Sequence, residues 1–215
     1  MPRPLRIQFP GAFYHVYNRG VEKRPIVRDD RDRRTFMQLL SESVKKYRLR
    51  LFAYCLMDNH FHLFFQITEK NLSEAMWKLL AQFVSYINLR YDRVGPLFQG
   101  RFRSRLVQTD LYAHVLARYI HQNPAEAGRV ERLEDFSWSS YPCYLGKIPK
   151  WDWLETEWLL KQFHPNPTTA MEIFRQFHAE KPSAAEKEKL DRISRPLTST
   201  ARDLALFPTK GAWPR

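Results

Sequence analysis

Two histidines separated by one residue are the first feature of this sequence that could do chemistry. His60 and His62 flank Phe61 within a run of apolar and aromatic residues. Alternate side chains of an extended strand share one face, so both imidazoles would point to the same side and Phe61 to the other. Two imidazoles at this spacing can chelate one divalent metal ion. The same pattern also fits two hydrogen-bonded histidines on a half-buried strand, so the pair alone leaves the metal site open.

A tyrosine and an asparagine one helical turn apart form the second candidate group. Tyr119 and Asn123 lie in a segment whose periodicity predicts a helix from Asp110 to about Asn123, because Pro124 disfavours helical backbone in the residue before it. An amide oxygen can complete a site for a hard cation, and a nearby tyrosine hydroxyl would lie close to that ion. Helical tyrosines are also common in cores, and asparagine before proline is a common helix end. Both interpretations fit the residues.

An alternating order of strands and helices must position these groups. We predict strands near residues 13–17, 49–57 and 60–67, amphipathic helices after Asp29 and Asn71, and an extended segment at 97–108. Asp58-Asn59 is typical of a hairpin turn between the second and third strands. This order predicts an α+β fold with a ferredoxin-like antiparallel sheet and helices on one face.

The domain organisation follows from length and periodicity. We expect a main domain at residues 1–145 of the 215, a helical or irregular extension at 146–180, and a weakly ordered tail at 181–215. Two cysteines are too few for a disulfide framework, and no apolar run is long enough to span a bilayer. The N-terminal residues lead into no secretory segment. We therefore expect a cytoplasmic protein with no membrane partner.

Positive charge is concentrated in the first half of the chain. The formal net charge is +12, and residues 1–107 contain 20 Lys or Arg against 9 Asp or Glu, whereas residues 108–215 contain 15 against 14. Such a localised excess favours a polyanionic partner, and nucleic acid is favoured over a membrane because no long basic amphipathic segment is present. Arg101, Arg103 and Arg105 recur at every second residue and are candidates for phosphate contacts. An edge strand kept soluble by its arginines is the alternative.

Six stretches of the chain resemble the REP-associated tyrosine transposases. This bacterial family is a branch of the single-tyrosine HUH endonucleases and is related to insertion-sequence transposases. The stretches occur in one order between about residues 10 and 145, namely FYHVYNRG at 13–20, YCLMDNHFHL at 54–63, LFQGRF at 97–102, RYIHQNP at 118–124, AG at 127–128 and WSSY at 138–141. Each stretch is short, but their combination is highly specific.

The resemblance implies a role for each candidate residue. His60 and His62 match the metal ligands of the family, and Tyr119 matches its nucleophile. Asn123 would be the third ligand, where related transposases often have the longer glutamine. The implied reaction is a Mg²⁺- or Mn²⁺-dependent cleavage of single-stranded or hairpin DNA that leaves a 5′-phosphotyrosine. Arg19, which precedes a glycine in one of the matching stretches, is a further candidate for DNA contact.

Two other functions stay open at this point. A non-catalytic protein that binds hairpin DNA would keep the fold and the basic surface, and the short Asn123 is the hint in its favour. A metal-dependent nuclease would use water in place of Tyr119 and leave no protein attached to the DNA. No nucleotide cofactor is expected, because the chain has no phosphate-loop motif. Related enzymes are often dimers, but the long extension favours a monomer, located with the nucleoid.

Overall fold

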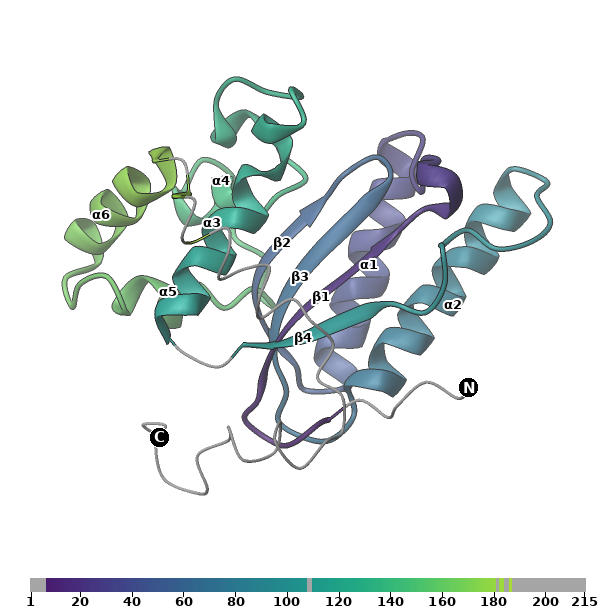
Figure 1. Cartoon of the computed structure of the whole chain (residues 1–215), viewed down its shortest axis with the longest axis horizontal. Coiled ribbons are helices and arrows are strands. Elements are labelled where there is room, and N and C mark those ends of the chain that lie inside the picture. The colour runs from purple at the N-terminus through teal and green to yellow at the C-terminus, as the bar shows by residue number, and fades with distance from the viewer. Residues whose placement is uncertain (1–6, 108–109, 181, 184–185, 187–215) are drawn as a thin grey trace.

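A four-stranded antiparallel sheet lies at the centre of this computed structural model, which describes residues 7–107, 110–180, 182–183 and 186 (Figure 1). The order in the sheet is β2-β3-β1-β4, so the first and third strands of the chain pair in the middle. The strands are β1 (Phe13–Arg19), β2 (Arg50–Leu56), β3 (His60–Gln66) and β4 (Arg103–Val107). The predicted α+β class with a ferredoxin-like antiparallel sheet is confirmed.

Two long helices cover one face of the sheet (Figure 1). They are α1 (Asp30–Lys46) and α2 (Leu72–Arg90), which also pack against each other. Alternation along the strands directs Val16, Phe61 and Leu63 into this core, where they join apolar side chains of both helices. The expectation of helices on one face therefore holds for this pair. A short 3₁₀ helix, η1 (Val21–Lys23), links β1 to the loop before α1.

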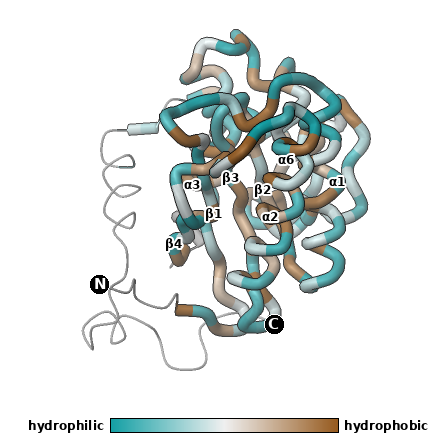
Figure 2. The backbone as a smooth tube through the Cα atoms, turned by 90° about the vertical axis from the view of Figure 1, so that its right-hand side faces the viewer, coloured by the Kyte–Doolittle hydropathy of each residue, from teal (hydrophilic) through white to brown (hydrophobic). Residues whose placement is uncertain are grey.

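A third helix lies against the other face of the sheet. This is α3 (Asp110–Glu126), which packs on β2 and β3. The strands present Phe52 and Phe64 to this side, and Leu116 and Phe174 complete a second apolar core. In the described part of the chain, α3 is followed by η2 (Leu133–Asp135), α4 (Tyr141–Tyr144), α5 (Glu157–Lys161) and α6 (Pro167–Ala179). The sheet is therefore covered on both sides, because its alternate residues are apolar on both faces. Figure 2 shows hydrophobic segments along the strands and hydrophilic ones along the outer turns.

The structure differs from the sequence predictions in two places. Helix α3 continues to Glu126 with Pro124 inside it, and its last turn is kept by a hydrogen bond from the Ala127 amide to the Asn123 carbonyl. The extended segment predicted at 97–108 forms a strand only from Arg103 to Val107. Helices α5 and α6 fall in the predicted extension, whereas most of the predicted tail at 181–215 lies outside the described residues. Within the described ranges, no helix combines the length and apolar character needed to cross a membrane.

Candidate active site

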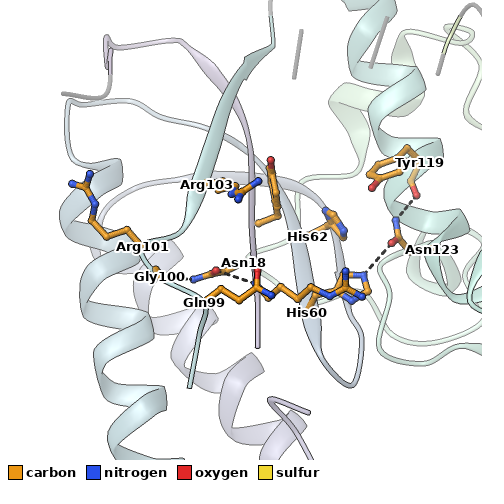
Figure 3. Close-up of a pocket in the computed structure, with 11 residues that line it drawn as sticks. Asn18, His60, His62, Gln99, Gly100, Arg101, Arg103, Tyr119 and Asn123 are labelled. Atoms are coloured by element: carbon orange, nitrogen blue, oxygen red, sulfur yellow. Dashed lines mark hydrogen bonds between the residues drawn. The ribbon is translucent and has the colours of Figure 1, made fainter. Parts of the chain in front are cut away.

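A pocket of about 340 Å³ lies where α3 meets the strands β1, β3 and β4. Eleven residues line it, and seven of them are among the eight site residues predicted from the sequence (Figure 3). The seven are Arg19, His60, His62, Arg101, Arg103, Tyr119 and Asn123. The eighth, Arg105, is not among the lining residues. The fold thus gathers residues from positions 19 to 123 around one cavity.

Strand pairing sets the floor of this pocket. In the β1–β3 ladder, Tyr17 lies opposite His62, and Arg19 lies opposite His60. In the β1–β4 ladder, Tyr17 also lies opposite Arg103. Directly paired residues share a face of the sheet, so the two imidazoles, the tyrosine and both arginines all belong to the side that α3 covers.

Two asparagine amides fix the environment of His60. The Asn59 side chain donates from Nδ2 to the Lys23 carbonyl, which leaves its Oδ1 2.7 Å from Nδ1 of His60. The Asn123 side chain donates from Nδ2 to the Tyr119 carbonyl, which leaves its Oδ1 3.2 Å from Nε2 of His60 (Figure 3). Each amide nitrogen is bonded to a carbonyl that can only accept, so each amide oxygen must face the imidazole.

The consequence is that His60 places a lone pair against a second acceptor. Neutral imidazole has one N–H, and both nitrogens of His60 face an amide oxygen. The shorter contact, 2.7 Å to Asn59, assigns the proton to Nδ1, which leaves Nε2 facing the Asn123 oxygen without a proton between them. Burial lowers the pKa of His60, and the Arg19 charge lowers it further against the opposing effect of Asn123, so the neutral form is favoured near pH 7. Two facing acceptors are stabilised by a cation between them. An imidazole nitrogen and an amide oxygen therefore fit a divalent metal.

The donor set contains no acidic side chain. Among the residues that the structure describes, no three His, Cys, Asp or Glu side chains gather into a metal-binding group. The pocket is lined by the imidazoles of His60 and His62 and by the amides of Asn18, Gln99 and Asn123, and the amide oxygen of Asn123 lies against Nε2 of His60. The two imidazoles and Asn123 are therefore the candidate protein ligands. Three ligands leave coordination positions for water or for a phosphate oxygen, as an open catalytic site requires.

Tyr119 lies over the histidines from the opposite wall of the pocket. Its ring approaches that of His62 edge-on, with centroids 5.4 Å apart and planes at 82°. Burial raises the pKa of Tyr119, as does the Glu126 charge, and the Asn123 contact and Arg105 oppose this effect. The hydroxyl is therefore protonated near neutral pH. Because Tyr119 is only half-buried and lines the cavity, it is available to a ligand in a way that a core tyrosine is not.

The arginines do not form the single row that their spacing predicted. Arg103 is exposed at the pocket, whereas Arg101 precedes β4 and points away from the histidines (Figure 3). The backbone before β4 leaves the strand geometry because it is tied to β1: the Asn18 side chain donates to the Gly100 carbonyl at 3.0 Å. Arg105 is partly buried, with its guanidinium 4.9 Å above the ring of Tyr17.

The family described as "Transposase IS200 like" matches residues 9–123, which include every candidate site residue. The chain belongs to this family. Its members are transposases, so membership implies an enzyme that cuts and rejoins DNA. The predicted resemblance within the insertion-sequence transposase superfamily is thus confirmed.

Two individual proteins extend the comparison. A Haemophilus influenzae protein named as a REP-associated tyrosine transposase is 26% identical to this IS200-like chain over 117 residues. The match covers 49% of this chain and 66% of that relative, so it spans just under two thirds of the relative's length. A solved structure of a REP-associated tyrosine transposase bound to a REP hairpin has a TM-score of 0.58 at 16% identity, covering 73% of this chain and 96% of that one. At this level of identity the likeness shows a shared fold.

Two residues beside His62 in this IS200-like transposase are not among the site residues predicted from the sequence. His15 and Tyr17 belong to β1 and, with Arg19, occupy alternate positions on one face. Nε2 of His15 lies 2.8 Å from Nδ1 of His62 and both rings are buried, which lowers the pKa of His15 to about 3, an effect to which Arg105 adds. Counting back by two from Arg19 would have found both residues.

The side of α3 that faces away from the pocket is held by the C-terminal end of α6. Gln122 donates from Nε2 to the carbonyls of His178 and Glu180 at 2.8 and 2.7 Å. His121 contacts His178 through ring nitrogens 2.9 Å apart, and the buried Arg118 guanidinium lies 4.0 Å from the ring centre of Phe177. Three residues of one helix face are thereby fixed by the extension. This contact sets the rotation of α3 that turns Tyr119 and Asn123 toward the sheet.

Proposed function

We propose that this IS200-like transposase cuts and rejoins single-stranded DNA next to a hairpin, with Tyr119 as its nucleophile. The observation that carries the proposal is the convergence of Tyr119 and Asn123 from α3 with His60 and His62 from β3 on one arginine-lined pocket. The two relatives named as REP-associated tyrosine transposases, one of them bound to a REP hairpin, support repeat hairpins as the substrate class.

The Tyr119 hydroxyl would attack the phosphorus of a phosphodiester. The bond to the 3′-oxygen breaks, the proton of the phenol ends on that oxygen, and the DNA is left with a free 3′-hydroxyl and a 5′-phosphotyrosine. Rejoining is the reverse reaction, and it needs no nucleotide because the phosphotyrosine is itself a phosphodiester. The T-shaped contact with His62 keeps the Tyr119 ring above the pocket floor, where the phosphate would lie.

His60, His62 and Asn123 would hold a Mg²⁺ or Mn²⁺ ion, whose chemistry is to polarise the phosphate and stabilise the leaving 3′-oxygen. The facing acceptors of His60 and Asn123 support this assignment. Asn123 is shorter than the glutamine of related enzymes, yet its oxygen already reaches Nε2 of His60 at 3.2 Å. The shorter side chain is therefore no obstacle to ligation, which weakens the argument for a purely binding protein.

Arg19 and Arg103 would bind the phosphates on either side of the scissile bond. Both are exposed and line the pocket on the face of the sheet, whereas arginines that only keep an edge strand soluble would have no reason to converge there. Arg101 would contact DNA farther from the reacting phosphate, and Arg105 would act through Tyr17, which it covers. Such a protein would work at the bacterial nucleoid.

One chain supplies the proposed nucleophile and all three proposed metal ligands. Helix α3 packs on the sheet of its own chain, so the nucleophile and the three ligands need no second subunit. This arrangement supports a monomer as the cleaving species. Size-exclusion chromatography with light scattering, with and without a bound hairpin, would show a mass near 25.8 kDa plus DNA if the proposal holds.

The decisive experiment traps the covalent product. Purified protein is incubated with end-labelled hairpin DNA bearing single-stranded flanks, in Mn²⁺ or EDTA, and separated on a denaturing gel. We expect a metal-dependent adduct in which the protein is joined to the 5′ phosphate of the fragment on the 3′ side of the break. This adduct should be absent in Tyr119→Phe and His60→Ala and retained in Tyr17→Phe, which removes a hydroxyl from the same pocket.

The alternative functions predict different results. Cleavage by Tyr119→Phe without an adduct would mean that water is the nucleophile and the protein is a hydrolase. Tight binding without cleavage across a panel of hairpins would identify a non-catalytic DNA-binding protein. An adduct lost in Tyr17→Phe and retained in Tyr119→Phe would show that Tyr17 is the nucleophile and would refute the role proposed for Tyr119.

A further inference from the structure

Each histidine of the pair has its Nδ1 held by a neighbouring side chain. For His60 the partner is Asn59, the preceding residue in the hairpin turn, with its oxygen at 2.7 Å. For His62 the partner is His15, which comes from a different strand and lies 47 positions earlier, with Nε2 at 2.8 Å. The second contact cannot arise from local geometry. It exists only because β1 and β3 pair in this register.

The register places His15 diagonally across from His62. The residue directly opposite His15 is Phe64, and the one directly opposite His62 is Tyr17, so the two histidines are diagonal neighbours on one face. Their ring centroids are 5.1 Å apart and their planes lie at 24°. Diagonal neighbours of an antiparallel pair are within reach of long and aromatic side chains, which allows this ring-to-ring hydrogen bond.

Aromatic rings enclose His15 on several sides. Tyr17 packs against it with centroids 4.9 Å apart, and the ring of Tyr119 meets it edge-on at 6.0 Å. Only 4% of the His15 surface is exposed, so contact with DNA is not its role. Its ring can therefore act on the pocket only through the side chains that it touches, and its side chain forms a hydrogen bond with His62.

We propose that His15 is a positioning residue, which binds Nδ1 of His62 and thereby turns Nε2 of His62 toward the pocket as a metal ligand. This inference rests on the proposed function, since it requires the metal site. A neutral imidazole has one protonated and one bare nitrogen. With His62 donating from Nδ1 to Nε2 of His15, the bare nitrogen of His62 is Nε2, which is the form that binds a metal.

Both histidine ligands have Nδ1 held by a hydrogen-bond partner, but the partner is an asparagine for His60 and a histidine for His62. With Asn59 accepting from Nδ1 of His60 and His15 accepting from Nδ1 of His62, both imidazoles would present a bare Nε2 to one cavity. Loss of such a supporting hydrogen bond typically lowers metal affinity by about 10–100-fold. We therefore expect His15→Phe, which keeps an aromatic ring but cannot accept a hydrogen bond, to weaken Mn²⁺ binding by a factor in this range.

The test measures Mn²⁺ affinity of the full chain without DNA, by isothermal titration calorimetry. The set contains wild type, His15→Phe, His15→Gln, His62→Ala and the control His164→Phe, which alters an exposed histidine of the extension. A glutamine amide reaches the position of Nε2 in histidine, so His15→Gln should recover most of the affinity lost in His15→Phe. The control should bind as wild type does. Thermal unfolding in EDTA verifies that each variant is folded.

The outcomes separate this inference from the proposed function. Unchanged Mn²⁺ affinity in His15→Phe, with binding abolished in His62→Ala, would overturn the role of His15 and leave the metal site standing. Absence of Mn²⁺ binding by wild type would overturn the metal site and this inference with it. If His15→Phe does not fold, nitrogen NMR of the wild-type imidazoles decides: a protonated Nδ1 and bare Nε2 on His62 support the proposal, and the reverse tautomer refutes it.

Discussion

The buried histidines behind α3 should make the fold sensitive to mild acid. His121 and His178 share a hydrogen bond of 2.9 Å, Ser140 contacts the other nitrogen of His121 at 2.7 Å, and His178 donates from Nδ1 to the Phe174 carbonyl at 2.8 Å. Burial lowers the pKa of His178 to about 3 and that of His121 well below its ordinary value. The His178 ring therefore stays neutral in the folded protein at pH 5.

The sign and size of the effect follow from the two protonation states. An unfolded histidine has a pKa of about 6.5, so above that pH neither state binds the proton and stability is unaffected. Below it the unfolded chain is protonated while folded His178 is not, and stability falls by about 1.4 kcal/mol per pH unit until the pH reaches about 3. Between pH 7.5 and 5.0, the protonation of His178 in the unfolded chain should by itself lower the free energy of unfolding by about 2 kcal/mol.

Urea denaturation at the two pH values measures this loss. His178→Gln removes the titrating group, so its loss of stability between pH 7.5 and 5.0 should be about 2 kcal/mol smaller than that of wild type. In thermal unfolding, the same difference corresponds to about 4–8 °C for a chain of this size. His164→Gln, which alters an exposed histidine, should lose as much as wild type. Equal losses in wild type and His178→Gln would refute the burial argument.

Three further predictions concern the pocket and its surroundings. Because burial raises the pKa of Tyr119, single-turnover cleavage in Mn²⁺ should speed up about tenfold per pH unit from pH 6 to 8, and a flat profile would contradict a tyrosinate nucleophile. Replacing Arg103 by Gln should reduce the slope of log K against log salt for single-stranded DNA by about 0.7, whereas Arg34→Gln, on the helix layer of the opposite face, should leave the slope unchanged. Gly20→Ala should lower stability by about 1–3 kcal/mol, because a Cβ would clash with the Arg24 carbonyl oxygen; an unchanged melting temperature would show that the loop adapts.

Local patterns in the sequence predicted most of the sheet and part of the pocket. Strand alternation correctly placed His60 and His62 on one face of β3, and helical spacing placed Tyr119 and Asn123 on one face of α3. Both patterns depend only on backbone geometry. Neither pattern could predict that α3 crosses to the face bearing the histidines. That placement depends on apolar residues from several strands, such as Phe52, which need cover on that side.

The sequence predictions that differ from the structure failed because of contacts between residues far apart in the chain. Arg101 was assigned to a strand by its spacing, but the hydrogen bond from Asn18, 82 positions away, holds the preceding residue in a loop. The sequence predicts the end of α3 near Asn123 because Pro124 disfavours helical backbone in the residue before it, yet the helix continues, and the Ala127 amide donates to the Asn123 carbonyl. His15 and Gln122 act through partners far along the chain. The partners of such side chains become visible only when the pairing of elements is known.

The division of the pocket between a sheet and a docked helix has an evolutionary consequence. The arginines belong to the β-sheet side, whereas the nucleophile and one ligand belong to α3, whose rotation depends on Arg118 and Gln122 at the back. Substitutions that remove these contacts would act on Tyr119 and Asn123 together and leave the arginines where they are. On the proposed function, loss of this helix contact would remove cleavage and keep the DNA-binding arginines, so a lineage could pass from an enzyme to a binding protein while its histidines remain intact.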